Sequence, residues 1–247
     1  KVGMGERMFF SPVRGQDQNL SYSLQGNKLL ILDGAIESLR TFEPEADPAG
    51  IDYRGTLTID ESGHMTGKLD VVLLNAANPY FRLYSDTAYA KRYASGAKEV
   101  ELLKNEQAES NFELSIDREG AWEQYGHYFF MDIPASRNGI DSWGFTYVEA
   151  GRQVPIRLNE MISEAYHYTF TVPEGFELVS PVLDVTIGNA IGELRISLKQ
   201  EGNNIYAERK IALVKETVDY SDFGAFSELW KAWMNPSMRE LILRKAE

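Results

Sequence analysis

The sequence lacks cysteine entirely and has only three histidines, His64, His127 and His167, among its 247 residues. The absence of cysteine excludes disulfide bonds, thiolate metal sites and a cysteine nucleophile within this chain. The histidines have no histidine partner two or four residues away, so the usual spacing of zinc ligands is missing. The chain therefore has few of the catalytic and metal-binding residues on which hydrolases and metalloenzymes commonly depend.

Basic residues and long apolar runs are also scarce. Lys and Arg total 25 against 37 Asp and Glu, which gives a net charge of −12. This excess of carboxylates repels phosphate groups and argues against nucleic acid and anionic membranes as partners. The longest apolar runs, such as residues 29–32 and 71–74, are far shorter than the roughly 20 residues of a membrane-spanning helix. No basic leader precedes an apolar segment and Lys1 is not an initiator Met, so we expect a piece of a longer protein.

Short runs of alternating apolar and polar residues dominate what is present. Glycine, aspartate and asparagine bound many of these runs, the pattern of strands joined by tight turns. This pattern predicts a mainly β protein with antiparallel sheets of the β-sandwich type. The predicted strands cover residues 29–32, 53–60, 65–74, 111–117, 125–131, 164–172, 182–187, 193–200, 204–214 and 238–245.

Two segments with helical spacing interrupt the strands. Residues 78–95 begin with Asn78-Pro79, a capping residue and a first-turn proline, and Gly96 ends the pattern. In residues 220–235, aromatic side chains recur at i, i+3, i+7 and i+10, so we expect this helix to pack on a sheet. Those four aromatic residues are Phe223, Phe226, Trp230 and Trp233.

Composition suggests how the chain is divided. Residues 43–50 (EPEADPAG) have two prolines, three acids and no large apolar side chain, which is typical of a linker. This linker separates an N-terminal segment, residues 1–42, from the main body. The body is predicted as two β regions, residues 51–150 and 151–247, or as one continuous domain from residue 51.

Two segments share the form Leu-[Thr/Ser]-Ile-Asp-x-x-Gly, at residues 57–63 and 114–120. We interpret both as hairpins that use the same Asp/Gly turn chemistry. Acidic pairs at Glu99 with Glu101 and at Asp60-Glu61 fit either a glycosidase acid and base or solvated carboxylates that protect edge strands.

No catalytic, cofactor-binding or metal-binding residue is assigned from the sequence. No serine has the flanking glycines of a Gly-x-Ser-x-Gly turn. A hydrolase with a carboxylate or Ser/His site remains one alternative. We expect His127 and His167 to pack on strand faces, and His64 to lie in solvent after a turn.

Aromatic residues are the enriched class, at 12% of the chain. Trp122, Tyr125, Trp143 and Tyr147 come from predicted loops or hairpins and are candidates for a sugar-stacking platform. They would make the chain a carbohydrate-binding module. The other interpretation is that these tryptophans fill the core of a β-sandwich.

The order of motifs in the last hundred residues carries a resemblance. Arg152-x-x-Pro155-Ile-x-Leu158 precedes Tyr166-x-Tyr168 with Pro173-x-Gly175, and Tyr220-x-x-Phe223 then leads into a helix and a strand. This order, over about residues 50–245, resembles the C-terminal β-rich domain of unknown function that follows a transglutaminase-like core in secreted proteins of Gram-negative bacteria.

The resemblance implies a non-catalytic role, because a transglutaminase-like core acts through a Cys-His-Asp triad and this chain has no cysteine. It implies an accessory or interaction domain of a larger, papain-like exported protein in the periplasm or on the cell surface. The expected partner is the neighbouring core in cis, an envelope protein or a glycan. No cofactor, nucleic acid or transmembrane segment is expected.

Overall fold

The computed structural model describes residues 47–143, 154–158 and 160–245 in full, and before them the backbone of four short strands. The chain divides into two compact units, residues 1–47 and 48–247. In the first unit β1 (Val2–Met4) pairs with β2 (Arg7–Phe9), and β3 (Lys28–Asp33) pairs with β4 (Ile36–Thr41). The predicted strand at residues 29–32 is confirmed as β3. Half of the predicted linker, residues 43–46, lies outside the described residues, and its last two residues already belong to the strand Ala49–Ile59.

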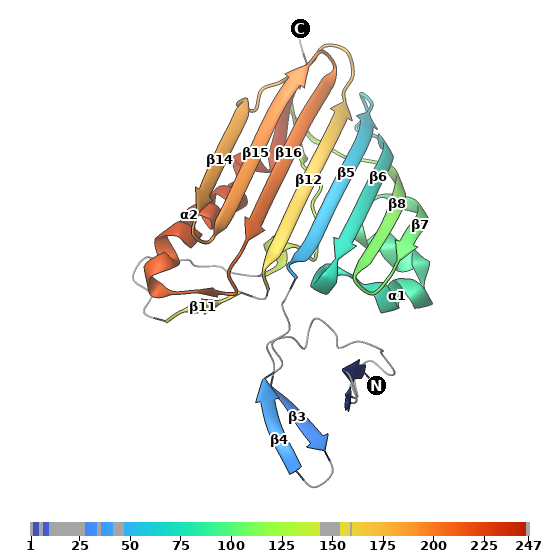
Figure 1. The fold of residues 1–247 in the computed structure, drawn as a ribbon. Coiled ribbons are helices and arrows are strands. Elements are labelled where there is room, and N and C mark those ends of the chain that lie inside the picture. Colours follow the sequence, from blue (N-terminus) through green and yellow to red (C-terminus); the bar gives the residue numbers. More distant parts are fainter. Residues whose placement is uncertain are drawn as a thin grey trace. The chain divides into compact units, whose positions relative to one another are not determined.

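The second unit is built on an eight-stranded sheet with the order β14-β15-β16-β12-β5-β6-β8-β7 (Figure 1). Seven of the predicted strands belong to this sheet and are confirmed, and β7 is added at its edge. The bounds are β5 (Ala49–Ile59), β6 (Met65–Leu74), β7 (Ala97–Asn105), β8 (Glu109–Arg118), β12 (Ile162–Thr171), β14 (Leu183–Asn189), β15 (Gly192–Glu201) and β16 (Asn204–Leu213).

The sheet is mixed, because its two central strands, β5 and β12, run parallel and all other neighbours run antiparallel. Ile162 lies opposite Ala49 and Thr171 opposite Thr58, so the parallel register spans ten residues. The sequence predicted mostly antiparallel sheets and gave no sign of this parallel pair. Alternation along a strand fixes which side chains face the core, but it does not fix the direction of a neighbour more than a hundred residues away.

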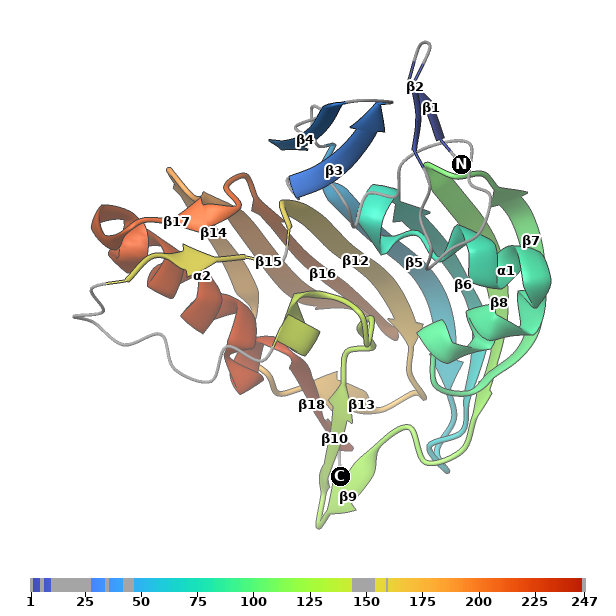
Figure 2. The same ribbon diagram turned by 90° about the horizontal axis from the view of Figure 1, so that it is seen from below.

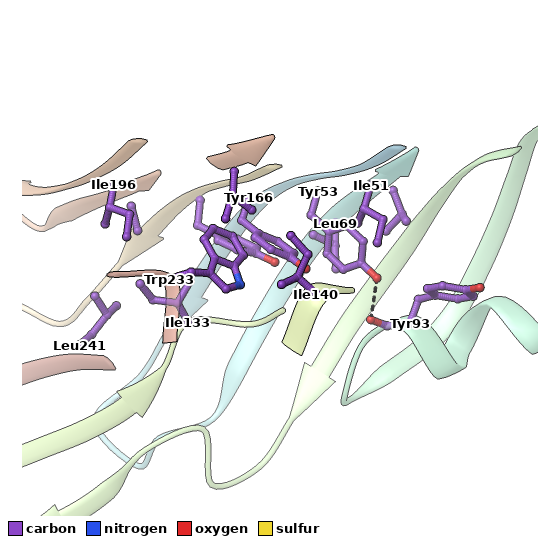
Figure 3. Packing of buried hydrophobic residues seen from close by; sticks show 14 of the residues in the cluster. Ile51, Tyr53, Leu69, Tyr93, Ile133, Ile140, Tyr166, Ile196, Trp233 and Leu241 are labelled. Carbon is purple, nitrogen blue, oxygen red and sulfur yellow. Dashed lines mark hydrogen bonds between the residues drawn. The ribbon is translucent and has the colours of Figure 1, made fainter. Parts of the chain in front are cut away.

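One face of the large sheet is buried. Along β5, Ile51, Tyr53, Leu57 and Ile59 are buried while Arg54 and the threonines between them are exposed. This is the period of two that the sequence predicted. Figure 3 shows the packing on this side, where the hydroxyl of Tyr53 donates to the carbonyl oxygen of Tyr93 at 3.1 Å.

A helix and a smaller sheet cover the buried face (Figure 2). The helix, α2 (Phe223–Met234), buries the four predicted aromatic residues and is held to β14 by the side chain of Asn189, which donates to the Ala225 carbonyl. The mainly β class with a C-terminal helix on a sheet is therefore confirmed. The smaller sheet has the order β13 (Phe176–Leu178), β18 (Glu240–Lys245), β10 (Tyr128–Asp132) and β9 (Glu123–Tyr125), and β18 confirms the predicted last strand.

The predicted helix at residues 78–95 is wrong as one continuous element. It is a short α1 (Tyr80–Ser85) followed by the 3-10 helix η3 (Thr87–Tyr93). Between them Asp86 is extended, with φ −152° and ψ 99°, and its carboxylate accepts from the Ala88 N–H at 2.9 Å. Aspartate competes with the helical hydrogen bonds in this way. Asn78 does not cap the helix, because its side-chain oxygen lies 2.6 Å from the Ser110 hydroxyl and its amide donates to the carbonyl oxygens of Glu106 and Gln107.

Only the first of the two predicted hairpins with shared turn chemistry is correct. Residues 57–63 join β5 to β6, with Gly63 at φ +81°. Residues 114–120 end β8, whose two edges are already occupied by β6 and β7, so the chain leaves for the smaller sheet. The predicted strand 125–131 is likewise split, because Gly126 at φ +62° turns β9 into β10. His127 is exposed at that turn, and the expectation that it packs on a strand face is wrong.

The remaining elements are short. β11 pairs with β17, and 3-10 turns lie at several connections. Their bounds are η2 (Asn75–Ala77), η4 (Ile140–Trp143), β11 (Ile156–Arg157), β17 (Thr217–Val218), η5 (Tyr220–Asp222) and η6 (Pro236–Met238). Within the described residues, no helix has both the length and the apolar character that a bilayer crossing requires.

Candidate functional site

A loop after β10 runs across the buried face of the sheet and is tied down by polar side chains from β12. The hydroxyl of Tyr166 accepts from the Ser136 N–H at 2.8 Å, and that of Tyr168 donates to the Pro134 carbonyl at 2.9 Å. Burial raises the pKa of both tyrosines well above the ordinary value, so both stay neutral. The Tyr-x-Tyr motif of the sequence therefore fixes the loop in place.

Glu164 fixes the next part of the same loop. It is 0% exposed, and its carboxylate accepts from the Ile140 N–H at 2.7 Å and from the Tyr166 hydroxyl. Burial raises the Glu164 pKa from 4.5 to about 7, against the lowering effect of these two donors. A Cβ on Gly139 would lie 2.4 Å from the carboxylate, so this position requires glycine.

A second buried charge, Arg209 on β16, anchors the end of α2. It is 1% exposed, its guanidinium donates to the Trp233 carbonyl at 2.9 Å, and its Cζ lies 4.2 Å from the Trp233 ring centroid. The Trp233 indole N–H donates in turn to Asp141 at 2.9 Å, and Asp141 pairs with Arg239 at 2.9 Å. This network joins the sheet, η4, α2 and the segment before β18.

Glu164 and Arg209 were both missed by the sequence reasoning. Each stands in the inward register of its strand, between apolar residues that are themselves buried. A charged residue in an otherwise apolar inward position is the signal that could have found them, because buried charges persist only with partners. Their contacts hold structural elements together, and neither side chain lines the two hollows described below.

The loop forms one wall of a cavity of about 270 Å³ under the sheet. Apolar side chains of β5, β6 and β8 make its floor, and the end of η3 makes the opposite wall. Three charged residues, Arg118, Asp132 and Arg137, line the cavity and are only partly buried or exposed, which places them at its rim. The floor residues include Leu57, Met65, Leu69 and Ile116.

A second hollow, of about 330 Å³, lies on the open face of the sheet at the parallel pair. Small residues, Gly50, Ser163 and Ala165, leave room there, and a Cβ on Gly50 would lie 2.8 Å from the side chain of Leu74. We call this hollow the central groove. The polar residues that line it carry both signs of charge and comprise Asp52, Arg54, His167, Glu208 and Lys210.

The four predicted stacking residues have different environments. Trp122 is only 9% exposed and lies parallel to Phe176, with ring centroids 5.3 Å apart. Tyr125 is 66% exposed on β9, Trp143 is half-buried against the core, and Tyr147 lies outside the described residues. The carbohydrate-binding alternative stays a prediction, and Tyr125 is the most exposed of the three candidates that the structure describes.

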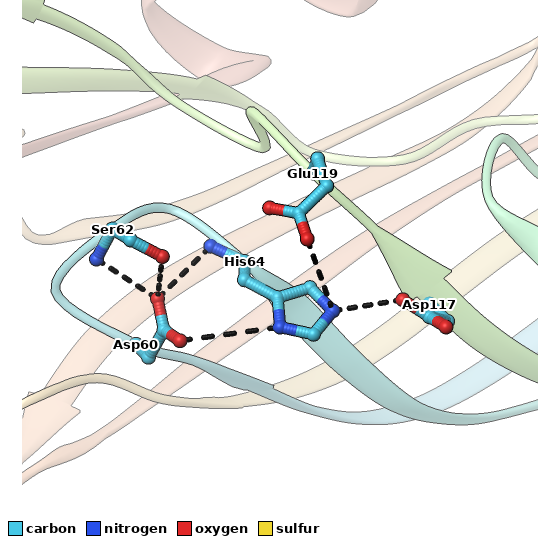
Figure 4. Close-up of polar contacts among 5 residues, drawn as sticks. All are labelled: Asp60, Ser62, His64, Asp117 and Glu119. Carbon is cyan, nitrogen blue, oxygen red and sulfur yellow. Dashed lines mark hydrogen bonds and ion pairs between the residues drawn. The ribbon is translucent and has the colours of Figure 1, made fainter.

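His64 lies among carboxylates on the β5–β6 hairpin (Figure 4). Its Nε2 lies 2.8 Å from Asp117 and 3.9 Å from Glu119, and the hydrogen bond to Asp117 raises the His64 pKa above 6.5. Ser62 does not contact the imidazole and instead donates to Asp60 at 2.6 Å. The cluster is an exposed ion pair that joins β8 to the hairpin, and its serine bonds to Asp60 and not to the imidazole.

The other candidate acids line neither of the two hollows described above. Glu99 and Glu101 are exposed on β7, the edge strand of the large sheet, where charge discourages pairing with other chains. Over the described ranges, no group of three or more His, Asp or Glu side chains is placed to hold a metal ion. The part of the chain that the structure describes contains no evident catalytic site.

The fold defines a mainly β domain, and comparisons with known proteins agree. A family model described as a domain of unknown function with a solved structure, DUF3858, matches residues 126–243. A crystal structure of a "putative protease" from Parabacteroides distasonis is similar in fold, with a TM-score of 0.50 and 19% identity. The similarity covers 84% of this chain and 29% of that one. No curated protein matches the chain. The predicted likeness to a domain of unknown function is confirmed for residues 126–243.

Proposed function

We propose that this chain is a non-catalytic accessory domain of a larger exported protein with a transglutaminase-like core, and that the central groove docks that core. The observation that carries the proposal is the groove itself, which lies in the middle of the open sheet face and has charges of both signs around small residues. The similarity to 29% of a longer bacterial chain supports a role as one part of a larger protein.

The charges on the open face are held loosely. Arg54 pairs with Asp52 at 3.1 Å and Lys210 with Glu193 at 3.9 Å, in each case between side chains that are substantially exposed. Exposed pairs of this kind contribute about 0–1 kcal/mol each. A partner with complementary charge can therefore exchange these pairs for its own at small cost, which gives specificity and register more than affinity.

The non-catalytic part of the proposal rests on chemistry. The chain has no cysteine to act as the nucleophile of such a core. His64 pairs with Asp117, and the Ser62 hydroxyl bonds to Asp60 and not to the imidazole, so the two do not form a Ser/His pair. Catalysis would then be carried out by the transglutaminase-like core. This domain would shape or position that core in the periplasm or at the cell surface of a Gram-negative bacterium.

The test begins with the complete reading frame, which is expected to encode an export signal and a transglutaminase-like core outside this chain. Core and chain, produced separately, are then mixed and their affinity measured by calorimetry. Reversing two groove charges, with Arg54→Glu and Lys210→Glu together, should weaken binding about tenfold or more.

The matched control reverses two charges on the same face outside the groove, with Lys68→Glu and Lys199→Glu, and should leave the affinity nearly unchanged. Both pairs of substitutions alter net charge equally, so a general electrostatic effect would weaken both. A reading frame without such a core, or equal losses in the two double variants, would overturn the proposal.

A further inference from the structure

The cavity under the sheet has the chemistry of a binding site, and it is separate from the groove proposed above. Its floor is apolar, formed by buried side chains of three strands. Its volume of about 270 Å³ corresponds to about nine water molecules at roughly 30 Å³ each, enough for a group the size of one amino-acid residue. Binding sites of this kind combine an apolar body with a few placed polar groups.

The rim supplies those polar groups. Among the described arginines, only Arg118, Arg137 and Arg157 lack an acidic or aromatic partner, and two of these three line this cavity. Unpaired arginines are notable in a chain with 37 acids and 25 basic residues. A guanidinium presents its N–H groups in a planar fork that matches a carboxylate.

Both sides of the rim are held in place by the fold. Arg118 ends β8 and packs against Gly96, where an added Cβ would lie 2.5 Å from the Arg118 Cβ. Arg137 directly follows Ser136, whose N–H is bound by the Tyr166 hydroxyl. Asp132, the third charged group, ends β10. Two cations and one anion leave the rim with one net positive charge.

We infer that this cavity binds an apolar amino-acid residue with a free α-carboxylate. The carboxylate lies between Arg118 and Arg137, the apolar side chain occupies the floor, and Asp132 accepts from the α-nitrogen. A free amino acid and the C-terminal residue of a peptide share this chemistry, since both offer a carboxylate and an N–H on one α-carbon. A second anionic group is disfavoured by Asp132.

The experiment measures binding to the full chain by calorimetry, with N-acetyl-leucine and its neutral carboxamide as the first pair of probes. The acid should bind at least tenfold more tightly than the amide. Arg118→Gln and Arg137→Gln should each weaken binding of the acid about tenfold, whereas Arg195→Gln, on the open face, should leave it unchanged. Asp132→Asn should weaken binding of free leucine, which has an ammonium group, much more than binding of N-acetyl-leucine, whose α N–H is neutral.

A short peptide ending in leucine, with a free or an amidated C-terminus, identifies the source. Tight binding of the free-acid peptide assigns the site to chain ends, and binding of leucine alone assigns it to free amino acids; either result supports the inference. Equal affinity for acid and amide, no binding of any probe at millimolar concentration, or an equal effect of Arg195→Gln would overturn it. The acid and amide comparison needs only the unsubstituted chain, so the test stands even if a variant fails to fold.

Discussion

The buried carboxylate of Glu164 makes the stability of this protein depend on pH in a defined window. Its pKa is raised from 4.5 to about 7 in the folded chain. Between these two values the folded chain keeps a proton that the unfolded chain has released. The free energy of unfolding therefore falls as pH rises through this window. The contribution of the Glu164 proton is fully lost above pH 7. At 1.36 kcal/mol for each pH unit, the loss is about 3 kcal/mol.

The perturbation that isolates this effect is Glu164→Gln, which keeps an acceptor for the Ile140 N–H but cannot titrate. Urea unfolding at several pH values from 5 to 8 gives the free energy of unfolding of both proteins. The advantage of the unsubstituted protein over the variant should shrink by about 2–3 kcal/mol as pH rises from 5 to 8. Glu208→Gln, which removes a carboxylate from the open face, serves as the matched control and should show no such change.

The difference between proteins is the informative quantity, because His64 also titrates in this range. Its raised pKa gives stability that is present below pH 6.5 and lost as pH rises through the folded value. Glu164 and His64 lie far apart. Glu164 is opposite Ile51 on β5, and the hairpin that carries His64 begins nine residues further along that strand, a distance of about 30 Å. Distant sites contribute independently, so the His64 effect cancels in the comparison. Parallel profiles for the unsubstituted protein and Glu164→Gln would refute the reasoning.

Three further predictions concern single positions. Trp233→Ala should lower the free energy of unfolding by about 3–5 kcal/mol in urea, since the indole is fully buried over a buried guanidinium; a loss below 1 kcal/mol would contradict this. Gly67→Ala should lower the free energy of unfolding by about 2–4 kcal/mol, because φ is +146° and a Cβ would lie 2.2 Å from a carbonyl oxygen. Gly120 has φ +62° but lies in open space, so Gly120→Ala should lower it by only about 1 kcal/mol. Similar losses for the two glycine variants would count against the argument. His64→Gln should cost more at pH 5.5 than at pH 8.5 in thermal unfolding, and a loss independent of pH would show that the ion pair with Asp117 does not matter.

Several elements could be read directly from the sequence because their signal is local. The alternation of Tyr53, Leu57 and Ile59 predicted β5 and its buried face, and the spacing of Phe223, Phe226 and Trp230 predicted α2. Such patterns record the burial of one face, which each element requires whatever its neighbours are. The local signal failed at Asp86, where a single carboxylate that bonds the next turn outweighed helical spacing.

The candidate sites were predicted less well, because each brings together residues distant in the sequence. The cavity joins Arg118 at the end of β8 to Arg137 in a loop, and the central groove joins Gly50 to Ser163 across the parallel pair. Trp122 was open to two interpretations from sequence, and its stacking on Phe176 is a contact between segments 54 residues apart.

The sequence by itself determined which side chains of each strand and helix face the core, and, through the absence of cysteine, that a thiol nucleophile does not belong to this chain. Only the tertiary structure decided that β5 and β12 lie side by side in parallel, that Tyr166 and Glu164 hold the loop at residues 133–140, and that a cavity opens beneath it. The physical reason is that periodicity reports whether a residue is buried, whereas the identity of its neighbours depends on the closure of long loops and on how whole faces pack.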